Sequence, residues 1–198
     1  MKKIIFSLLI VGALASCGGN EEKSENKEGY TTIEGASFPT ELSIDSTKLV
    51  LNGVGLRKFL FIKVYVAGLY LPKKNRDEIV VIDADEPSVL RLHAISRAFT
   101  SERMANTVRE QFEKSNKGHT AELQTRIDIL CNRLAQETIE LGDECDISYT
   151  PDEGIRFAKN GKDLNILLSG LDFKKALWNN FLGENPAEEG LKKGLLGL

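Results

Sequence analysis

Two long stretches rich in β-branched and aromatic residues constrain the fold of this chain more than any other feature. They cover residues 48–57 and 60–71, and only a short gap separates them. Such residues favour strands, and a short connection between two strands favours an antiparallel hairpin. Pro72 ends the second stretch. The sequence therefore predicts a long antiparallel hairpin over these residues.

The rest of the chain alternates between strand-like and helical patterns. Met104, Val108 and Phe112 recur at helical spacing in a segment that begins near residue 100. Asn160-Gly161 favours a type I′ hairpin, because both residues tolerate positive φ. The other expected elements are a short helix over 76–82, strands near 89–96, 145–150, 154–159 and 162–168, and helices over 123–134, 171–182 and 191–198. This order predicts an α+β fold with a mostly antiparallel sheet and helices layered on one face.

The first residues have the pattern of an export signal. A positive start at Lys2-Lys3 precedes an apolar run over 4–15, which is too short to span a bilayer. The run ends in Leu14-Ala15-Ser16-Cys17, and small residues before a cysteine resemble the lipobox of bacterial lipoproteins. That resemblance implies that residues 1–16 are a signal peptide and that Cys17 is acylated. The alternative is an ordinary signal peptide with an incidental cysteine.

The segment after Cys17 is polar. Residues 18–29 contain no apolar side chain, so we expect residues 17–29 to be a lipid anchor and flexible tether. Residues 30–198 are then a single domain, held on a membrane through acylated Cys17. We expect this membrane to belong to the bacterial cell envelope and to be the outer membrane. Glu21-Glu22 resembles acidic signals that send some lipoproteins to the cell surface.

Charge and composition exclude some kinds of partner. Without Lys2 and Lys3, 24 of the 26 basic residues remain against 29 acidic ones, which gives a net charge of −5. Because no basic block stands out, we expect no nucleic-acid partner. His93 and His119 lie far apart and without a carboxylate cluster, so we expect no metal site and no cofactor. Cys131 and Cys145 are either a disulfide, which export permits, or two buried thiols.

Five motifs in one order resemble the chalcone isomerase family. The first is the hairpin, with Asn52-Gly-Val-Gly-Leu-Arg57 followed by Lys63-Val-Tyr65-Val-Ala-Gly-Leu-Tyr70-Leu71. The others are Phe38-Pro39, then Gly142-Asp143 with Tyr149-x-Pro151 and Gly154, then Asp172-Phe173 with Trp178, then Leu182-Gly183, Pro186 and Leu195-Leu196-Gly197. The resemblance covers residues 36–198. It implies an open-faced β-sandwich with a ligand cleft between sheet and helices.

The resemblance also implies where a site lies. Family enzymes use an arginine at the hairpin, a threonine on the next strand, and a tyrosine and an asparagine on the first long helix. The matching positions here are Arg57, Tyr65, Met104 and Gln111. Met104 has no acidic proton and no useful hydrogen-bond donor. The hydroxyl that polarises the carbonyl in the enzyme is therefore missing.

Three functional hypotheses follow. In the first, the protein is a non-catalytic binder of a fatty acid or similar small amphiphilic acid. Arg57 would bind the carboxylate through two parallel hydrogen bonds, and Tyr65 would donate a third. Met104 would line the cleft, and Lys63 would be either a second cation at the cleft or a residue at its edge. In the second, an isomerase acts on a chalcone-like enone with Arg57 and Tyr65 as its catalytic pair. In the third, an envelope interaction protein keeps a vestigial cleft, and Arg57 and Tyr65 are ordinary strand residues.

Overall fold

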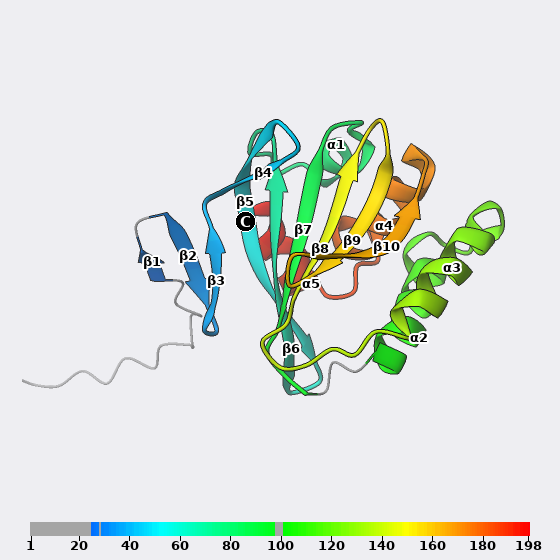
Figure 1. Cartoon of the computed structure of the whole chain (residues 1–198), viewed down its shortest axis with the longest axis horizontal. Helices are drawn as coiled ribbons and strands as arrows, with labels where there is room; N and C mark the ends of the chain where they lie inside the picture. The colour runs from blue at the N-terminus through cyan, green and yellow to red at the C-terminus, as the bar shows by residue number, and fades with distance from the viewer. Residues whose placement is uncertain (1–24, 28, 98–100) are drawn as a thin grey trace, which may run out of the picture.

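A curled seven-stranded antiparallel sheet forms the centre of the molecule (Figure 1). The computed structural model describes residues 25–27, 29–97 and 101–198, so the predicted signal peptide and acylated Cys17 lie outside the described residues. The strand order is β10-β9-β8-β7-β6-β5-β4. Their bounds are β4 (Glu41–Ile44), β5 (Thr47–Phe59), β6 (Ile62–Leu71), β7 (Ser88–Ala94), β8 (Glu144–Thr150), β9 (Gly154–Lys159) and β10 (Lys162–Leu168).

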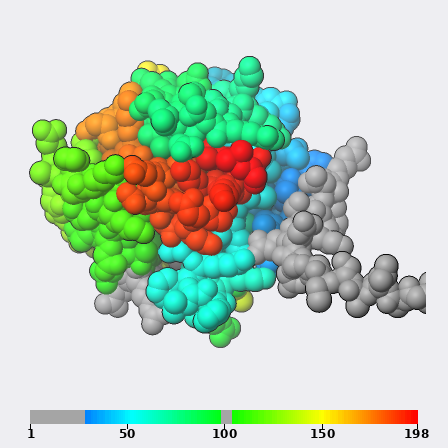
Figure 2. All heavy atoms as spheres, turned by 180° about the vertical axis from the view of Figure 1, so that it is seen from behind, coloured from blue at the N-terminus to red at the C-terminus, as the bar shows by residue number. Residues whose placement is uncertain are grey.

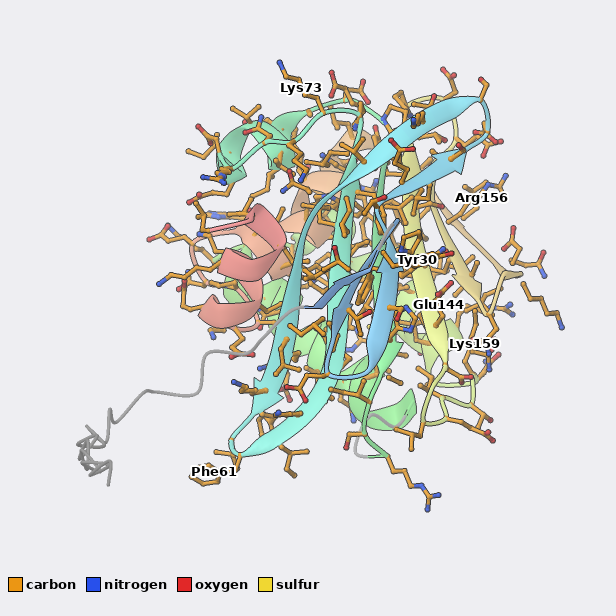
Figure 3. The ribbon with its side chains drawn as sticks, turned by 90° about the vertical axis from the view of Figure 1, so that its left-hand side faces the viewer. Tyr30, Phe61, Lys73, Glu144, Arg156 and Lys159 are labelled. Atoms are coloured by element: carbon orange, nitrogen blue, oxygen red, sulfur yellow. The ribbon has the colours of Figure 1, made fainter. Side chains whose placement is uncertain are left out.

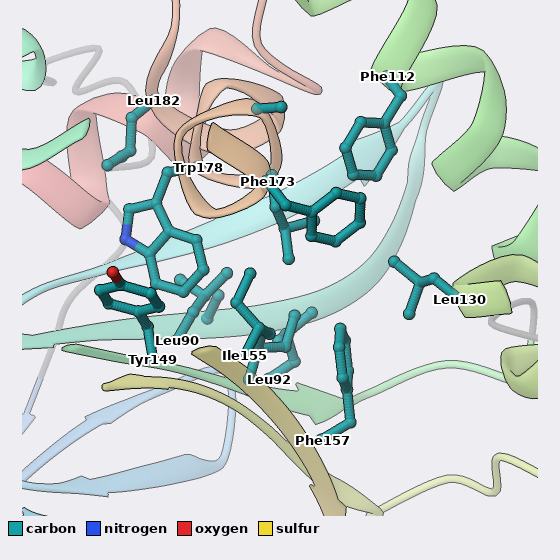
Figure 4. Packing of buried hydrophobic residues seen from close by; sticks show 14 of the residues in the cluster. Leu90, Leu92, Phe112, Leu130, Tyr149, Ile155, Phe157, Phe173, Trp178 and Leu182 are labelled. Carbon is teal, nitrogen blue, oxygen red and sulfur yellow. The ribbon is translucent and has the colours of Figure 1, made fainter. Parts of the chain in front are cut away.

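Helices cover one face of this sheet, as predicted. They are α1 (Glu78–Asp83), α2 (Ser101–Ser115), α3 (Gln124–Leu134), α4 (Leu171–Leu182) and α5 (Glu189–Leu196), with a 3₁₀ turn at Ala121–Leu123. The main core lies between sheet and helices (Figure 4). Phe112 of α2 stacks on Phe173 of α4 at 5.4 Å between ring centroids. The α+β prediction of an open-faced sandwich is confirmed.

The hairpins are also confirmed. Strands β5 and β6 pair along their length, with Arg57 opposite Tyr65. Between β9 and β10, Asn160 and Gly161 both have positive φ, as a type I′ turn requires.

Of a second, three-stranded sheet, only the short strand at Phe38-Pro39 was expected, from the family resemblance. This sheet consists of β1 (Glu25–Lys27), β2 (Tyr30–Ile33) and β3 (Ala36–Pro39). Phe38 of β3 is fully buried in a second core against the sheet face that faces away from the helices. The end of the expected tether therefore pairs as a strand, because backbone hydrogen bonds need no apolar side chains.

The two cysteines of the domain are free thiols. Cys131 of α3 is buried in the main core, and Cys145 of β8 packs against the same core. Burial raises the pKa of Cys145 to about 11 and also raises the pKa of Cys131. The sequence left open a disulfide or two free thiols, and the structure shows two free thiols.

Lys174 is a buried cation in the first turn of α4. Its Nζ donates to the carbonyl oxygens of Val81, Ile82 and Ala84, at 2.8, 2.9 and 2.9 Å. These carbonyls belong to the C-terminal end of α1, where helix carbonyls lack partners along the chain. Burial, and to a smaller extent the charge of Lys175, lowers the pKa of Lys174 to about 8, although Asp83, Asp85 and Glu86 oppose the shift.

This shift predicts a pH dependence of stability. The pKa of Lys174 is near 8 in the folded chain, against an ordinary value of 10.5. Between these values the unfolded chain holds a proton that the folded chain has lost, so this group makes stability rise with pH, by roughly 2–4 kcal/mol in all. Urea unfolding of the wild type and of Lys174→Met at several pH values between 8 and 10.5 measures it. The gain should vanish in the variant, and parallel curves for the two proteins would contradict the assignment.

The domain holds its own core. The buried residues of both cores lie between Ile33 and Leu196 in the part of the chain that the structure describes, so residues 25–198 contain the packing that holds the fold. Among these described residues, no helix has the length and apolar character needed to cross a bilayer.

Candidate functional site

The glycines of the Gly-Val-Gly motif let helix α5 lie directly on strand β5. A Cβ on Gly53 would be 2.2 Å from the backbone oxygen of Gly194, and one on Gly55 would be 2.4 Å from the backbone oxygen of Leu191. No side chain fits in these spaces. The motif therefore sets the position of α5, and with it the position of the residue before α5, Glu188.

Asn52 fixes the other end of α5. Its buried side-chain amide donates to the carbonyl oxygen of Leu195 at 2.8 Å, and its Oδ1 accepts from the backbone N–H of Asn75 at 2.7 Å. Both polar atoms of this buried side chain therefore have a hydrogen-bond partner. Seen from behind, α5 lies across the middle of the molecule, next to the β5–β6 hairpin (Figure 2).

Arg57 and Tyr65 form the centre of the candidate site. They face each other across β5 and β6. Tyr65 belongs to the main core, so the pair lies on the sheet face that carries the helices. Arg57 is partly buried, and its Nη1 donates to the carbonyl oxygen of Lys58.

Glu188 brings a carboxylate to the same place, and the sequence analysis missed it. Its Oε2 lies 3.9 Å from Nη1 of Arg57 and accepts from the backbone N–H of Lys58 at 2.6 Å. The guanidinium of Arg57 thus already has a carboxylate near it, although not in a bidentate contact. Because 131 positions separate Arg57 from Glu188 in the chain (57 to 188), no local pattern could have indicated the contact.

Tyr65 is a neutral phenol at neutral pH, and its surroundings raise its pKa further. Burial raises the pKa of Tyr65 to about 12; the guanidinium of Arg57 acts against this rise, and the carboxylate of Glu188 adds to it. A neutral phenol can donate a hydrogen bond. The pair therefore offers a fixed cation and a hydroxyl donor, which is the chemistry that recognises a carboxylate.

The other predicted residues have separate positions. Met104 is half-buried on α2 and packs against the main core. Gln111 donates through Nε2 to the carbonyl oxygen of Asn185 at 2.8 Å, so it holds the loop that leads to Glu188. Lys63 does not point to Arg57, because its Nζ contacts Oε1 of Glu34 at 2.6 Å. In the structure Lys63 is therefore paired with Glu34 and does not act as a second cation beside Arg57.

Comparisons with known proteins agree with this architecture. A family model described as chalcone isomerase-like matches residues 30–197. A crystal structure of a fatty-acid binding protein from Arabidopsis thaliana superimposes with a TM-score of 0.64 and 19% sequence identity, over 82% of this chain and 92% of that one. At this identity the likeness shows the fold alone. No curated protein matches the chain.

Proposed function

Since the chain belongs to the chalcone isomerase-like family, whose model matches residues 30–197, we propose that it binds a fatty acid or similar small amphiphilic acid without catalysing a reaction. The observation that carries the proposal is the pairing of Arg57 with Tyr65 on the helix-covered face of the sheet. The similar Arabidopsis structure, a fatty-acid binding protein, supports the same class of ligand.

The ligand carboxylate would take the place beside Arg57 that Glu188 now approaches. Because Nη1 of Arg57 lies 3.9 Å from Oε2 of Glu188, this carboxylate does not form a close bidentate contact with the guanidinium. The acyl chain would contact partly buried apolar side chains that pack against the main core, and Met104 and Val108 of α2 are two such side chains. A thioether at position 104 has no proton to donate, which favours binding over ring closure.

Anchoring belongs to the same proposal. The apolar run before Cys17 and the polar segment after it support a lipoprotein, which we expect to be held at the outer membrane of the bacterial envelope. A domain on a short tether would stay close to a source of acyl chains. The anchor therefore suits a lipid ligand.

The position of Glu188 provides a test in which affinity rises. Glu188→Gln removes a negative charge near the ligand carboxylate but keeps an oxygen that accepts from the N–H of Lys58. The affinity for a fatty acid should increase roughly 3- to 10-fold. Calorimetric titration of wild type and variant with the same acid measures it.

The matching fatty alcohol is the control ligand, because it has no charge and should respond little to the substitution. Unchanged or weaker acid binding in Glu188→Gln would contradict the assigned position of the carboxylate. Absence of acid binding in both proteins would contradict the function itself.

A further inference from the structure

The tip of the β5–β6 hairpin is an exposed apolar surface that neither core uses. Its four residues are consecutive, and their exposed fractions are 61% for Phe59, 78% for Leu60, 101% for Phe61 and 49% for Ile62. Phe59 and Ile62 close the hairpin, and Leu60 and Phe61 form the turn. We call these four residues the hairpin tip.

The hairpin tip projects beyond the rest of the sheet. The pairing of β6 with β7 ends at Tyr65 opposite Ala94, whereas β5 and β6 continue to pair as far as Phe59 opposite Ile62. Figure 3 shows Phe61 at the lower end of the molecule, opposite the end that carries Lys73. A projecting two-stranded tip presents its side chains on several sides at once.

The residues of the tip are poor choices for the fold alone. Leu60 has a φ of +55°, a conformation in which a two-residue hairpin turn favours glycine or asparagine. Lys58 and Lys63 lie directly opposite each other behind the tip, and the ion pair of Lys63 with Glu34 offsets part of the repulsion between like charges in such a pair. Four exposed apolar side chains gain nothing in water. These features are consistent with selection for an environment other than water.

We infer that the hairpin tip inserts into the surface of a lipid bilayer, as a membrane contact separate from any lipid anchor. Phenylalanine, leucine and isoleucine side chains are stabilised in the acyl region, and the two lysines behind them would lie at the depth of the headgroups. A tip of four side chains is small for a stable protein interface, which needs a broad complementary surface. A bilayer accepts a narrow apolar projection without such a surface.

The charges near the tip indicate whether electrostatic attraction or the burial of apolar side chains contributes more to membrane binding. Arg57, Lys58 and Lys63 are accompanied by two carboxylates, Glu34 and Glu188. The local excess of positive charge is therefore small. Anionic lipid should strengthen the contact modestly, and the apolar side chains should supply most of it.

Co-sedimentation with vesicles tests the inference without the anchor. Residues 25–198, which contain both cores, are mixed with vesicles of equal parts phosphatidylcholine and phosphatidylglycerol. Phe61→Asp should lower the partition coefficient by roughly tenfold or more. The matched control is Ile79→Asp, since Ile79 is 66% exposed on α1, at the other end of the sheet (Figure 1). It should bind as the wild type does.

A second measurement reports depth. Phe61→Trp places an indole at the tip, and acyl chains brominated near the headgroup should quench it, whereas Trp178, 2% exposed in the core, should not be quenched in the wild type. Equal partition of Phe61→Asp and wild type would overturn the inference. An indole that is not quenched would also overturn it. Weak partition of the wild type, together with self-association or protein binding through the tip, would overturn it as well. The result is independent of acid binding, which titration in vesicle-free solution measures.

Discussion

Replacing Arg57 by methionine should lower the affinity of the domain for a fatty acid about 10- to 100-fold, or ~1.5–3 kcal/mol. Methionine keeps much of the length and apolar character of the side chain but removes the charge and every donor. The tyrosine opposite, Tyr65, would keep its protonated hydroxyl, since burial raises its pKa and the loss of the Arg57 charge would raise it further. Titration calorimetry with a fatty acid compares the two proteins.

The corresponding fatty alcohol separates the head of the ligand from its chain. Arg57→Met should reduce the affinity for the alcohol far less than that for the acid, because the lost interaction is with the carboxylate. Lys63→Met is the matched protein control, since Lys63 pairs with Glu34 and not with the site. Equal losses for acid and alcohol, or equal losses for the two variants, would show that Arg57 does not bind the carboxylate.

Replacing Gly55 by alanine should lower the free energy of unfolding by about 2–4 kcal/mol. The new Cβ would lie 2.4 Å from the backbone oxygen of Leu191, and backbone cannot move aside as the end of a side chain can. Helix α5 must shift away from β5. Urea unfolding monitored by circular dichroism measures the loss.

Gly190 is the control for this substitution. It lies in α5 itself, and a Cβ there would meet only the side chain of Glu188, at 3.2 Å and beyond. Gly190→Ala should therefore change stability by no more than about 1 kcal/mol, in the stabilising direction that helix propensity favours. Similar losses for the two variants would mean that the close approach of β5 and α5 does not explain the Gly-Val-Gly motif.

The regular elements could be predicted because their signals are local. The β-branched stretches gave the central hairpin, and the dipeptide Asn160-Gly161 gave a turn whose two residues have positive φ. The helical stripe from Met104 to Phe112 gave α2. Each of these signals depends on the spacing of residues that are close in the sequence, so it does not depend on how the elements are arranged in space.

The small sheet β1–β3 could not be predicted in the same way. Its strands have three or four residues each, and they are ordered by pairing with one another and by the burial of Phe38 on the larger sheet. Residues 25–27 carry no apolar pattern at all. Backbone pairing leaves no pattern of apolar residues in the sequence, so hydrophobic periodicity does not predict it.

The arrangement of the candidate site could be predicted only in part. Arg57 and Tyr65 are opposite each other in the hairpin register, as their strand positions allow. Glu188 could not be found, because its contact with Arg57 closes over a long stretch of chain. Outside the site, the burial of Lys174 could not be predicted either, because lysine is almost always exposed. Lys63 shares strand parity with Tyr65, but a register shift between Arg57 and Lys58 and the ion pair with Glu34 separate it from the site.

Mass spectrometry of what co-purifies with the domain tests the central claim most directly. Residues 25–198 and their Arg57→Met variant are purified side by side without detergent, extracted with organic solvent, and the extracts are compared. The account predicts a fatty acid or similar amphiphilic acid in near-stoichiometric amount from the wild type and a strongly reduced amount from the variant. Empty extracts from both, together with no binding of added fatty acid, would contradict it.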